Sequence, residues 1–313
     1  MSTEKKLHQP WLVAVWPGMG QVASSAGYYL MAKLGMHLLA ELPTQGLFDI
    51  DAVAVKDGVY QRAGLPRNRL FVWEDPRKQH DIVVFIGEAQ PPVGKFAFCL
   101  KLIEQARQLG VERVFTFAAM ATAMHPEHES RVFAAATDES CLEELKKFPV
   151  EVLESGQIGG LNGVLIGAAA ENGLRGYTLL GEMPHIFAQL PYPKAALAIL
   201  DVFTKFAGVN IDTTELEEQS RLMERKLGEL LAKIEASMTT QPQPQTEEET
   251  YGTPTEEEPE QRISPKDQQH LERLFQEARQ DRSRAYELKR ELDRLGVFRD
   301  YEDRFLDLFK GPE

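Results

Sequence analysis

The sequence predicts a three-layer α/β/α fold with a mostly parallel, mixed sheet and a helical extension at its C-terminus. From Trp11 to about Gly208, short β-branched runs alternate with longer segments whose apolar residues recur at helical spacing. Beyond residue 211 only helical spacing remains. The chain has 313 residues, which exceeds the length that one hydrophobic core usually serves, so we expect one large domain with an appendage, or two domains.

Eight runs have the length and composition of strands. Residues 81–86 are continuously apolar, which is typical of a central strand covered on both faces. Residues 52–60 are typical of a hairpin that turns at Asp57 and Gly58, so we expect the sheet to be mixed at one edge. The predicted strands lie near residues 11–16, 37–41, 51–55, 69–73, 81–86, 112–117, 131–135 and 176–180.

Helical segments separate these strands, and the composition then divides the chain into four parts. The predicted helices lie near residues 20–34, 94–109, 138–147, 160–172 and 193–207. The expected parts are an α/β domain at 1–210, an amphipathic helix packing on it at 211–238, a disordered acidic linker at 239–263 and a helical segment at 264–313. The apolar stripe of the amphipathic helix is Leu216, Met223, Leu227, Leu230 and Ile234.

The final part predicts two helices. Ser264 and Pro265 open the first, Gly296 ends it, and its leucines follow the 3-4 spacing of a coiled-coil seam. Asp281 stands in that seam where an apolar residue is expected. The second helix, residues 301–309, presents an apolar face to some partner surface, and we expect the first to pair with residues 213–238 or to act independently. The apolar residues of the second helix are Phe305, Leu306, Leu308 and Phe309.

Charge and cysteine usage exclude several classes of protein. The net charge is −13, which argues against a nucleic-acid partner because such partners require a basic surface. About half of that excess lies in residues 239–263, which hold seven Glu and one Arg. No long apolar run predicts a membrane span, and no signal peptide is indicated, so we expect a cytoplasmic protein. Two distant cysteines, Cys99 and Cys141, predict neither a disulfide framework nor a zinc site.

The first glycine cluster follows a predicted strand and opens a helix. Gly18 and Gly20 lie in the sequence Pro17-Gly18-Met19-Gly20, which partly matches a dinucleotide-binding turn. Free backbone N–H groups at such a turn can hold an anion. The alternative is a structural turn or a contact between subunits, and Pro17, where the fingerprint needs an ordinary residue, favours it.

A second cluster surrounds the start of the helix at 160–172. Gly160, Asn162 and Gly163 precede a run of small residues, which lets a sheet or another subunit approach closely. The functional alternative is again a polar ligand at the helix start.

Two further sites follow predicted strands. Glu182 and His185 end a buried strand, at the edge where open α/β folds bind ligands, and Glu88 follows the most apolar strand. Glu and His can share a proton, but a carboxylate that caps backbone amides is the commoner arrangement. We find no nucleophile with a supporting base, and we therefore predict no catalytic residues. The question of enzymatic activity stays open, with a non-enzymatic protein favoured.

Residues 125–129 are the only dense set of metal-ligand types, but Pro126 places them in a loop where their side chains need not converge. We predict no metal and no cofactor.

These motifs, in this order, resemble one family. Pro17-Gly18-Met19-Gly20, Gly87-Glu88 with Gln90-Pro91, Gly159-Gly160-Leu161-Asn162-Gly163 and the run Leu179 to His185 are similar to the proteasome assembly chaperone 2 family and its archaeal and bacterial relatives. The resemblance spans about 11–235. It implies a fold like that of nucleoside phosphorylases, self-association, and a non-catalytic role in holding proteasome α-subunits.

The sequence departs from the family pattern in two respects. Some proteasome-binding members of the family end in a penultimate tyrosine, whereas this sequence ends Phe309-Lys310-Gly311-Pro312-Glu313. The acidic linker and the segment after it are also not required by the minimal family domain.

We therefore expect a non-enzymatic scaffold or interaction protein that forms a homo-oligomer and binds a proteasome-type or other protein partner, with no nucleic acid and no membrane. The alternative is a protein or enzyme that binds a nucleotide, nucleoside or carboxylate through Gly18, Gly20, Glu88, Asn162, Glu182 and His185.

Overall fold

The computed structural model describes residues 6–44, 46–49, 53, 55–56, 58–60, 64–239 and 263–310. In this part of the chain a sheet of eight strands runs in the order β2-β5-β6-β1-β7-β10-β8-β9. Its strands are β1 Trp11–Val15, β2 His37–Leu42, β5 Asn68–Trp73, β6 Ile82–Gly87, β7 Arg113–Thr122, β8 Val132–Ala136, β9 Glu151–Val152 and β10 Arg175–Pro184. The mostly parallel, mixed sheet predicted from the sequence is confirmed.

The four central strands are parallel, and this places their carboxyl ends together. β1 pairs with β6 and with β7, and β7 pairs with β10, all in parallel. The residues that follow these strands therefore share one edge of the sheet. β6 is buried throughout, as its continuous apolar run predicts.

Antiparallel pairs flank this centre on both sides. β5 runs antiparallel to β6 and β2, and β8 runs antiparallel to β10. The sheet is therefore mixed at both edges, whereas the sequence predicted one. The predicted hairpin exists as a separate pair, β3 Val55–Lys56 with β4 Val59–Tyr60, and of its turn residues Asp57 lies outside the described part.

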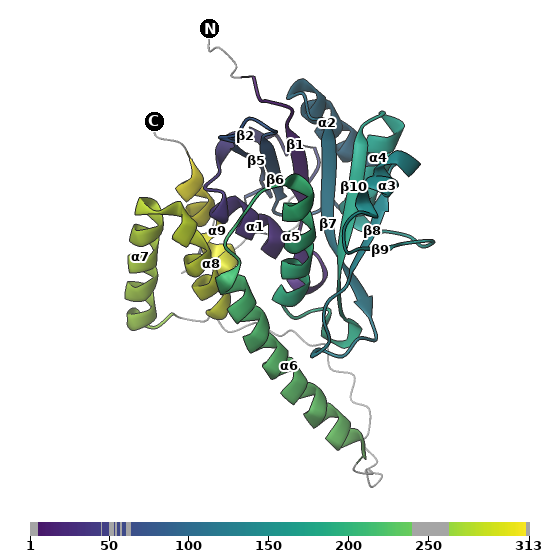
Figure 1. Ribbon diagram of the computed structural model, residues 1–313. Coiled ribbons are helices and arrows are strands. Elements are labelled where there is room, and N and C mark those ends of the chain that lie inside the picture. Colours follow the sequence, from purple (N-terminus) through teal and green to yellow (C-terminus); the bar gives the residue numbers. More distant parts are fainter. Residues whose placement is uncertain are drawn as a thin grey trace.

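Helices cover both faces of the sheet (Figure 1). One core joins α2 and α4 to one face of the sheet, and a second core joins α1, α3, α5 and the C-terminal helices to the other. The domain helices are α1 Val22–Lys33, α2 Lys95–Gln108, α3 Glu139–Leu145, α4 Gly160–Glu171 and α5 Pro193–Ala207. Each lies within a few residues of its predicted range.

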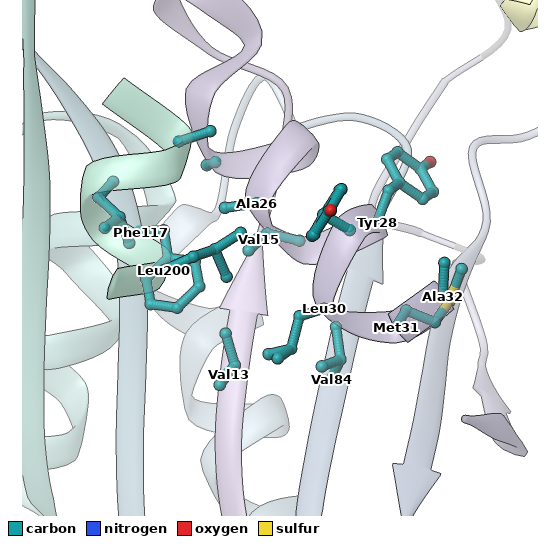
Figure 2. Packing of buried hydrophobic residues seen from close by; sticks show 14 of the residues in the cluster. Val13, Val15, Ala26, Tyr28, Leu30, Met31, Ala32, Val84, Phe117 and Leu200 are labelled. Carbon is teal, nitrogen blue, oxygen red and sulfur yellow. The ribbon is translucent and has the colours of Figure 1, made fainter. Parts of the chain in front are cut away.

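The helix α1 packs by two different sides. Toward the sheet, its small and aliphatic residues meet Val13 and Val15 of β1, as Figure 2 shows. A Cβ at Gly27 would lie 2.5 Å from a methyl of Val15, so glycine permits this close approach. In Figure 2, Tyr28 points away from these valines. It is nevertheless buried, because residues near the C-terminus cover it.

The amphipathic helix forms as predicted and extends beyond the domain. It is α6 Thr214–Thr239, it packs on α5, and its distal end projects past the sheet (Figure 1). Leu216 and Leu227 of its stripe are buried, but Leu230 is 40% exposed. One link between α6 and the C-terminal helices is the hydrogen bond from the hydroxyl of Tyr286 to the side chain of Gln219.

We call residues 263–310 the C-terminal segment. It contains α7 Pro265–Gln280, α8 Ala285–Arg294 and α9 Phe298–Leu306, and it lies beside α1 and the β2-β5 edge (Figure 1). The single helix expected over 265–295 breaks at Asp281, whose backbone is extended and whose carboxylate accepts the backbone N–H of Ser283 at 3.0 Å. A local bond of this kind competes with helix continuation. The linker predicted at 239–263 lies almost wholly outside the described residues.

The apolar face of the last helix is buried rather than exposed. Phe305 and Phe309 have no exposed surface, and Leu306 and Leu308 are buried with them. The partner surface that this apolar face was expected to require is the protein's own α/β domain. Over the described residues, no helix combines the length and hydrophobicity needed to cross a bilayer.

Candidate functional site

A cleft of about 1100 Å³ opens at the carboxyl ends of β1 and β6. One wall belongs to the α/β domain and includes Gly18, Gly20 and Glu88. The opposite wall belongs to the C-terminal segment and includes Lys289 and Glu302. The cleft therefore lies at the edge where open α/β sheets bind ligands, with the C-terminal segment closing one side.

Gly20 holds the turn after β1 against a neighbouring loop. Its N–H donates to the carbonyl of Ala188 at 2.8 Å, and its own carbonyl accepts from the N–H of Tyr192 at 2.9 Å. Its φ is +59°, and a Cβ there would lie 2.7 Å from the Sδ of Met183. The positive φ and the close packing thus favour glycine at this position, and the Gly20 N–H is already hydrogen-bonded within the chain. Gly18 is extended, and a Cβ there would meet nothing within 4 Å.

Glu88 binds the strand β5 from the rim of this cleft. One carboxylate oxygen accepts from Arg69 at 2.9 Å, and the other accepts the backbone N–H of Arg67 at 2.8 Å. Burial raises the pKa of Glu88 above its ordinary value, although Arg69 and the Arg67 amide oppose that change. Glu88 is therefore committed to a structural contact within the domain.

The C-terminal segment supplies two further carboxyl groups of the cleft, those of Asp293 and Glu302. Glu302 accepts a hydrogen bond from the hydroxyl of Tyr28, and burial raises the pKa of Glu302. Lys289 lies 4.1 Å from the centre of the Phe298 ring and pairs with Asp293 at 2.7 Å. The hydrogen bond between Tyr28 and Glu302 joins the two walls of the cleft, whereas the contacts of Lys289 with Phe298 and Asp293 lie within the C-terminal segment.

Asp303 lies next to Glu302 and contacts two arginines at once. Arg67 binds it at 2.6 Å, and Arg69 binds the same carboxylate oxygen. Arg67 also binds Glu41 through two hydrogen bonds of 2.6 and 2.7 Å. Burial would raise the pKa of Asp303, but the hydrogen bonds from Arg69 and Arg67 hold it below its ordinary value. Asp303 is thus ionised between two cations.

Glu182 and His185 have separate partners. Glu182 is buried, and it accepts hydrogen bonds from Thr122 at 2.7 Å and from the guanidinium of Arg131 at 2.6 and 2.7 Å. The Arg131 hydrogen bond lowers the pKa of Glu182. His185 is exposed, and its Nδ1 lies 2.8 Å from the carbonyl of Thr122. Glu182 is therefore an ionised structural carboxylate that ties β10 to β7 and to the loop before β8.

The start of α4 is occupied by a side chain. The Oε1 of Gln90 accepts the backbone N–H of Leu161 at 3.1 Å, and the Nε2 of Gln90 donates to the carbonyl of Pro17 at 3.2 Å. A Cβ at Gly160 would lie 2.9 Å from that Oε1, and a Cβ at Gly163 would lie 1.9 Å from the Ile158 carbonyl oxygen. Asn162 is buried in this first turn. Gln90 thus caps the helix where an anion was considered.

The structure brings Gly18, Gly20 and Glu88 into one cleft and places the other predicted residues elsewhere. The charged cluster of Arg67, Arg69 and Asp303 was not predicted, because no local motif contains these residues. The available signal was the pair of arginines separated by one residue, Arg67 just before β5 and Arg69 within it, since residues with this spacing share one side of an extended chain. Among the described residues, no group of three His, Cys, Asp or Glu side chains is placed to hold a metal. Both cysteines are free and buried.

Comparisons with known proteins agree with this fold. Pyrococcus furiosus PbaB, described as an archaeal proteasome activator, is 28% identical with a TM-score of 0.62, covering 74% of this chain and 96% of that chain. A PAC2 family protein from Streptomyces avermitilis is 24% identical with a TM-score of 0.62, covering 74% and 100%. An uncharacterized protein of Methanocaldococcus jannaschii is 25% identical over 72% of this chain and 87% of its own length.

The family model described as PAC2 family matches residues 12–231, a range that holds the whole main sheet except Trp11, the first residue of β1. The family predicted from the ordered motifs is therefore confirmed, and this chain belongs to the PAC2 family.

Proposed function

We propose that this chain is a non-enzymatic, self-associating interaction protein of the cytoplasm, with a role like that of proteasome-assembly chaperones. The observation that carries the proposal is membership of the PAC2 family together with the commitment of Glu88 and Glu182 to arginines. A general acid or base needs a proton that it can exchange with substrate. Glu182, ionised and buried beneath Arg131, is poorly suited to that task.

An exposed apolar stripe at the start of α2 is the surface that we propose for self-association. Phe96 and Leu100 lie one turn apart on α2 and are 42% and 38% exposed, and Val93, in the loop immediately before the helix, is 76% exposed. Clustered apolar side chains on a protein surface commonly mark interaction sites. The close approaches at Gly20 and Gly163 are made within one chain, so contacts between copies are assigned to this stripe instead.

Sedimentation analysis tests the stripe directly. We expect the full chain to associate at micromolar concentration, and Phe96→Lys to weaken that association at least tenfold. Glu104→Gln is the matched control, because it makes the same change in charge on an exposed residue of the same helix and should have no effect. A monomeric full chain, or equal effects of both substitutions, would contradict the assignment.

A proteasome core particle is the partner that we propose, on the basis of the resemblance to PbaB. Binding of the full chain to core particles from the same source, measured by co-sedimentation, tests it. Saturable binding supports the proposal, and the absence of binding at ten micromolar would direct the search to other protein partners.

The cleft favours a second candidate, the binding of a small polar molecule beside Gly18, Gly20 and Glu88. Thermal-shift measurements with nucleotides, phosphorylated sugars and amino acids test it, because a ligand at 100 times its dissociation constant adds about 2.7 kcal/mol of stability. A shift that Glu88→Gln abolishes would support a ligand site, and no shift with any of these compounds would remove the candidate.

A further inference from the structure

The C-terminal segment holds itself together as one unit. Arg304 of α9 forms two hydrogen bonds of 2.5 Å with Glu272 of α7, and its guanidinium lies 3.9 Å from the centre of the Phe275 ring. Phe275 also packs on Tyr301, with ring centres 6.0 Å apart. Polar and aromatic contacts thus join the first and last helices of the segment to each other.

This unit rests on a surface that we call the seat, made of Tyr28 and Tyr29 of α1 and of Arg67, Arg69 and Phe71 in and beside β5. Tyr28 packs edge-on against Phe298 and Phe305 at 5.3 and 5.8 Å between ring centres. Phe309 packs on Phe71 at 6.1 Å. Aromatic pairs of this geometry contribute beyond the area that they bury, so the seat recognises phenylalanines at fixed positions.

Both arginines of the seat are paired with carboxylates of the α/β domain, and these pairs do not involve the segment. Arg67 has Glu41, and Arg69, which is 2% exposed, has Glu88. Removal of one member of a buried ion pair is normally costly, because it leaves an uncompensated charge. Here the departure of Asp303 leaves each arginine with a carboxylate of its own domain. Each of these two arginines would therefore keep a carboxylate partner if the segment left the seat.

The connection to the seat is long and lacks aliphatic residues. Residues 240–262 join α6 to the segment and contain seven Glu and no Leu, Ile, Val, Met or Phe. The family model ends at residue 231, and solved relatives align over nearly their whole length with about three quarters of this chain. The segment is thus an addition to the family domain, and its contacts with the seat would be the same whichever copy supplied it.

We propose that the seat is a docking site for a helix that presents a carboxylate and, two positions later, a phenylalanine, as Asp303 and Phe305 do. The C-terminal segment fills the seat within its own chain, and the segment of a second copy takes its place during assembly. Exchange of an identical element is a low-cost route to association, since it forms no new type of contact. The inference rests on the proposed self-association and adds to it a second contact between copies, distinct from the stripe on α2.

Exchange in a cut chain tests the proposal. A protease recognition sequence replaces residues 247–253 of the full chain, and cleavage leaves both pieces present. The cut protein is then mixed with a second preparation whose segment carries a fluorophore at its C-terminus. We expect the labelled segment to co-elute with the unlabelled α/β domain in size-exclusion chromatography. Asp303→Asn in the labelled segment should weaken its binding about tenfold, because the negative charge that accepts hydrogen bonds from two guanidinium groups is removed.

Asp300→Asn is the matched control, since Asp300 is exposed on the same helix and the substitution changes the charge equally. Three results would overturn the proposal: no transfer within a day, equal binding of both variants, or loss of the far-ultraviolet circular dichroism of the α/β domain when the segment leaves. The last would mean that the segment belongs to an indivisible core. The Phe96→Lys variant separates this proposal from the first, because it alters association through α2 and leaves segment exchange unchanged.

Discussion

Asp303 of α9 binds Arg69 of β5, 234 positions earlier in the chain. The same carboxylate oxygen binds Arg67, which precedes β5. Through this contact the last helix is fixed to the antiparallel edge of the sheet and closes one side of the cleft at the carboxyl ends of β1 and β6. The carboxylate of Asp303 therefore attaches the C-terminal segment to the α/β domain beside the cleft.

Asp303→Asn should lower the free energy of unfolding by about 1 kcal/mol. The loss is limited because Asp303 is largely exposed and Arg69 keeps Glu88. Asp300→Asn should change it by less than about 0.5 kcal/mol. Urea denaturation at pH 7 measures both values, and equal values would show that Asp303 does not hold the segment.

The two glycines after β1 should respond differently to substitution. Gly20→Ala should destabilise the protein by about 1–3 kcal/mol, because its φ is positive and the new methyl would collide with Met183. Gly18→Ala should be within about 0.5 kcal/mol of the parent, because its backbone is extended and the space beside it is open. Melting temperatures test this difference, and a reversed order would mean that the turn is packed otherwise.

Glu144 should contribute to the loss of stability in acid. Burial opposes its ionisation, but hydrogen bonds from Tyr177, Arg113 and Arg175 lower its pKa to about 2. A carboxyl whose pKa is lower in the folded state contributes stability above its unfolded pKa, and that contribution is lost as the pH falls from about 4.5 toward 2. Glu144→Gln should therefore show a shallower fall in unfolding free energy over this range. An identical pH profile would contradict the assignment.

Glu302 should affect the pH dependence of stability in the sense opposite to Glu144. Burial raises its pKa in the folded state, so the unfolded chain loses its proton first and stability falls as the pH rises from its ordinary value to the raised one. Glu302→Gln keeps a group that can bond the Tyr28 hydroxyl and removes this titration. Denaturation at pH 5 and pH 8 should show a smaller difference for the variant than for the parent. A difference of equal size would mean that Glu302 is not desolvated.

The buried aromatic residues of α9 offer a test of how far the segment supports the domain. Phe305→Ala should lower the free energy of unfolding by about 3–5 kcal/mol, because the ring is completely buried. The exposed Leu222→Ala on α6 should cost less than about 1 kcal/mol. Amide hydrogen exchange shows where the structure is weakened. In Phe305→Ala, protection from exchange should fall first in α9 and along α1. Uniform loss across the sheet would mean that the segment unfolds only with the whole molecule.

Local patterns were sufficient for most elements of the domain, since the spacing of apolar residues in a strand or helix indicates which of its faces is buried. The continuous apolar run of β6 and the Pro193 start of α5 gave their positions within one residue. The strand β9, only two residues long, carried no such signal. At Asp281 a coiled-coil spacing suggested continuity, but the side chain's local hydrogen bond to Ser283 ended the helix.

The sequence by itself determined the three layers, the parallel centre of the sheet and the family, because all of these follow from periodicity and from motifs in a fixed order. Only the tertiary structure decided that Phe305 and Phe309 lie against the chain's own domain and that Asp303 meets Arg67 and Arg69. The physical reason is that an amphipathic pattern states which side of a helix must be covered. It carries no information about which distant residues provide the cover.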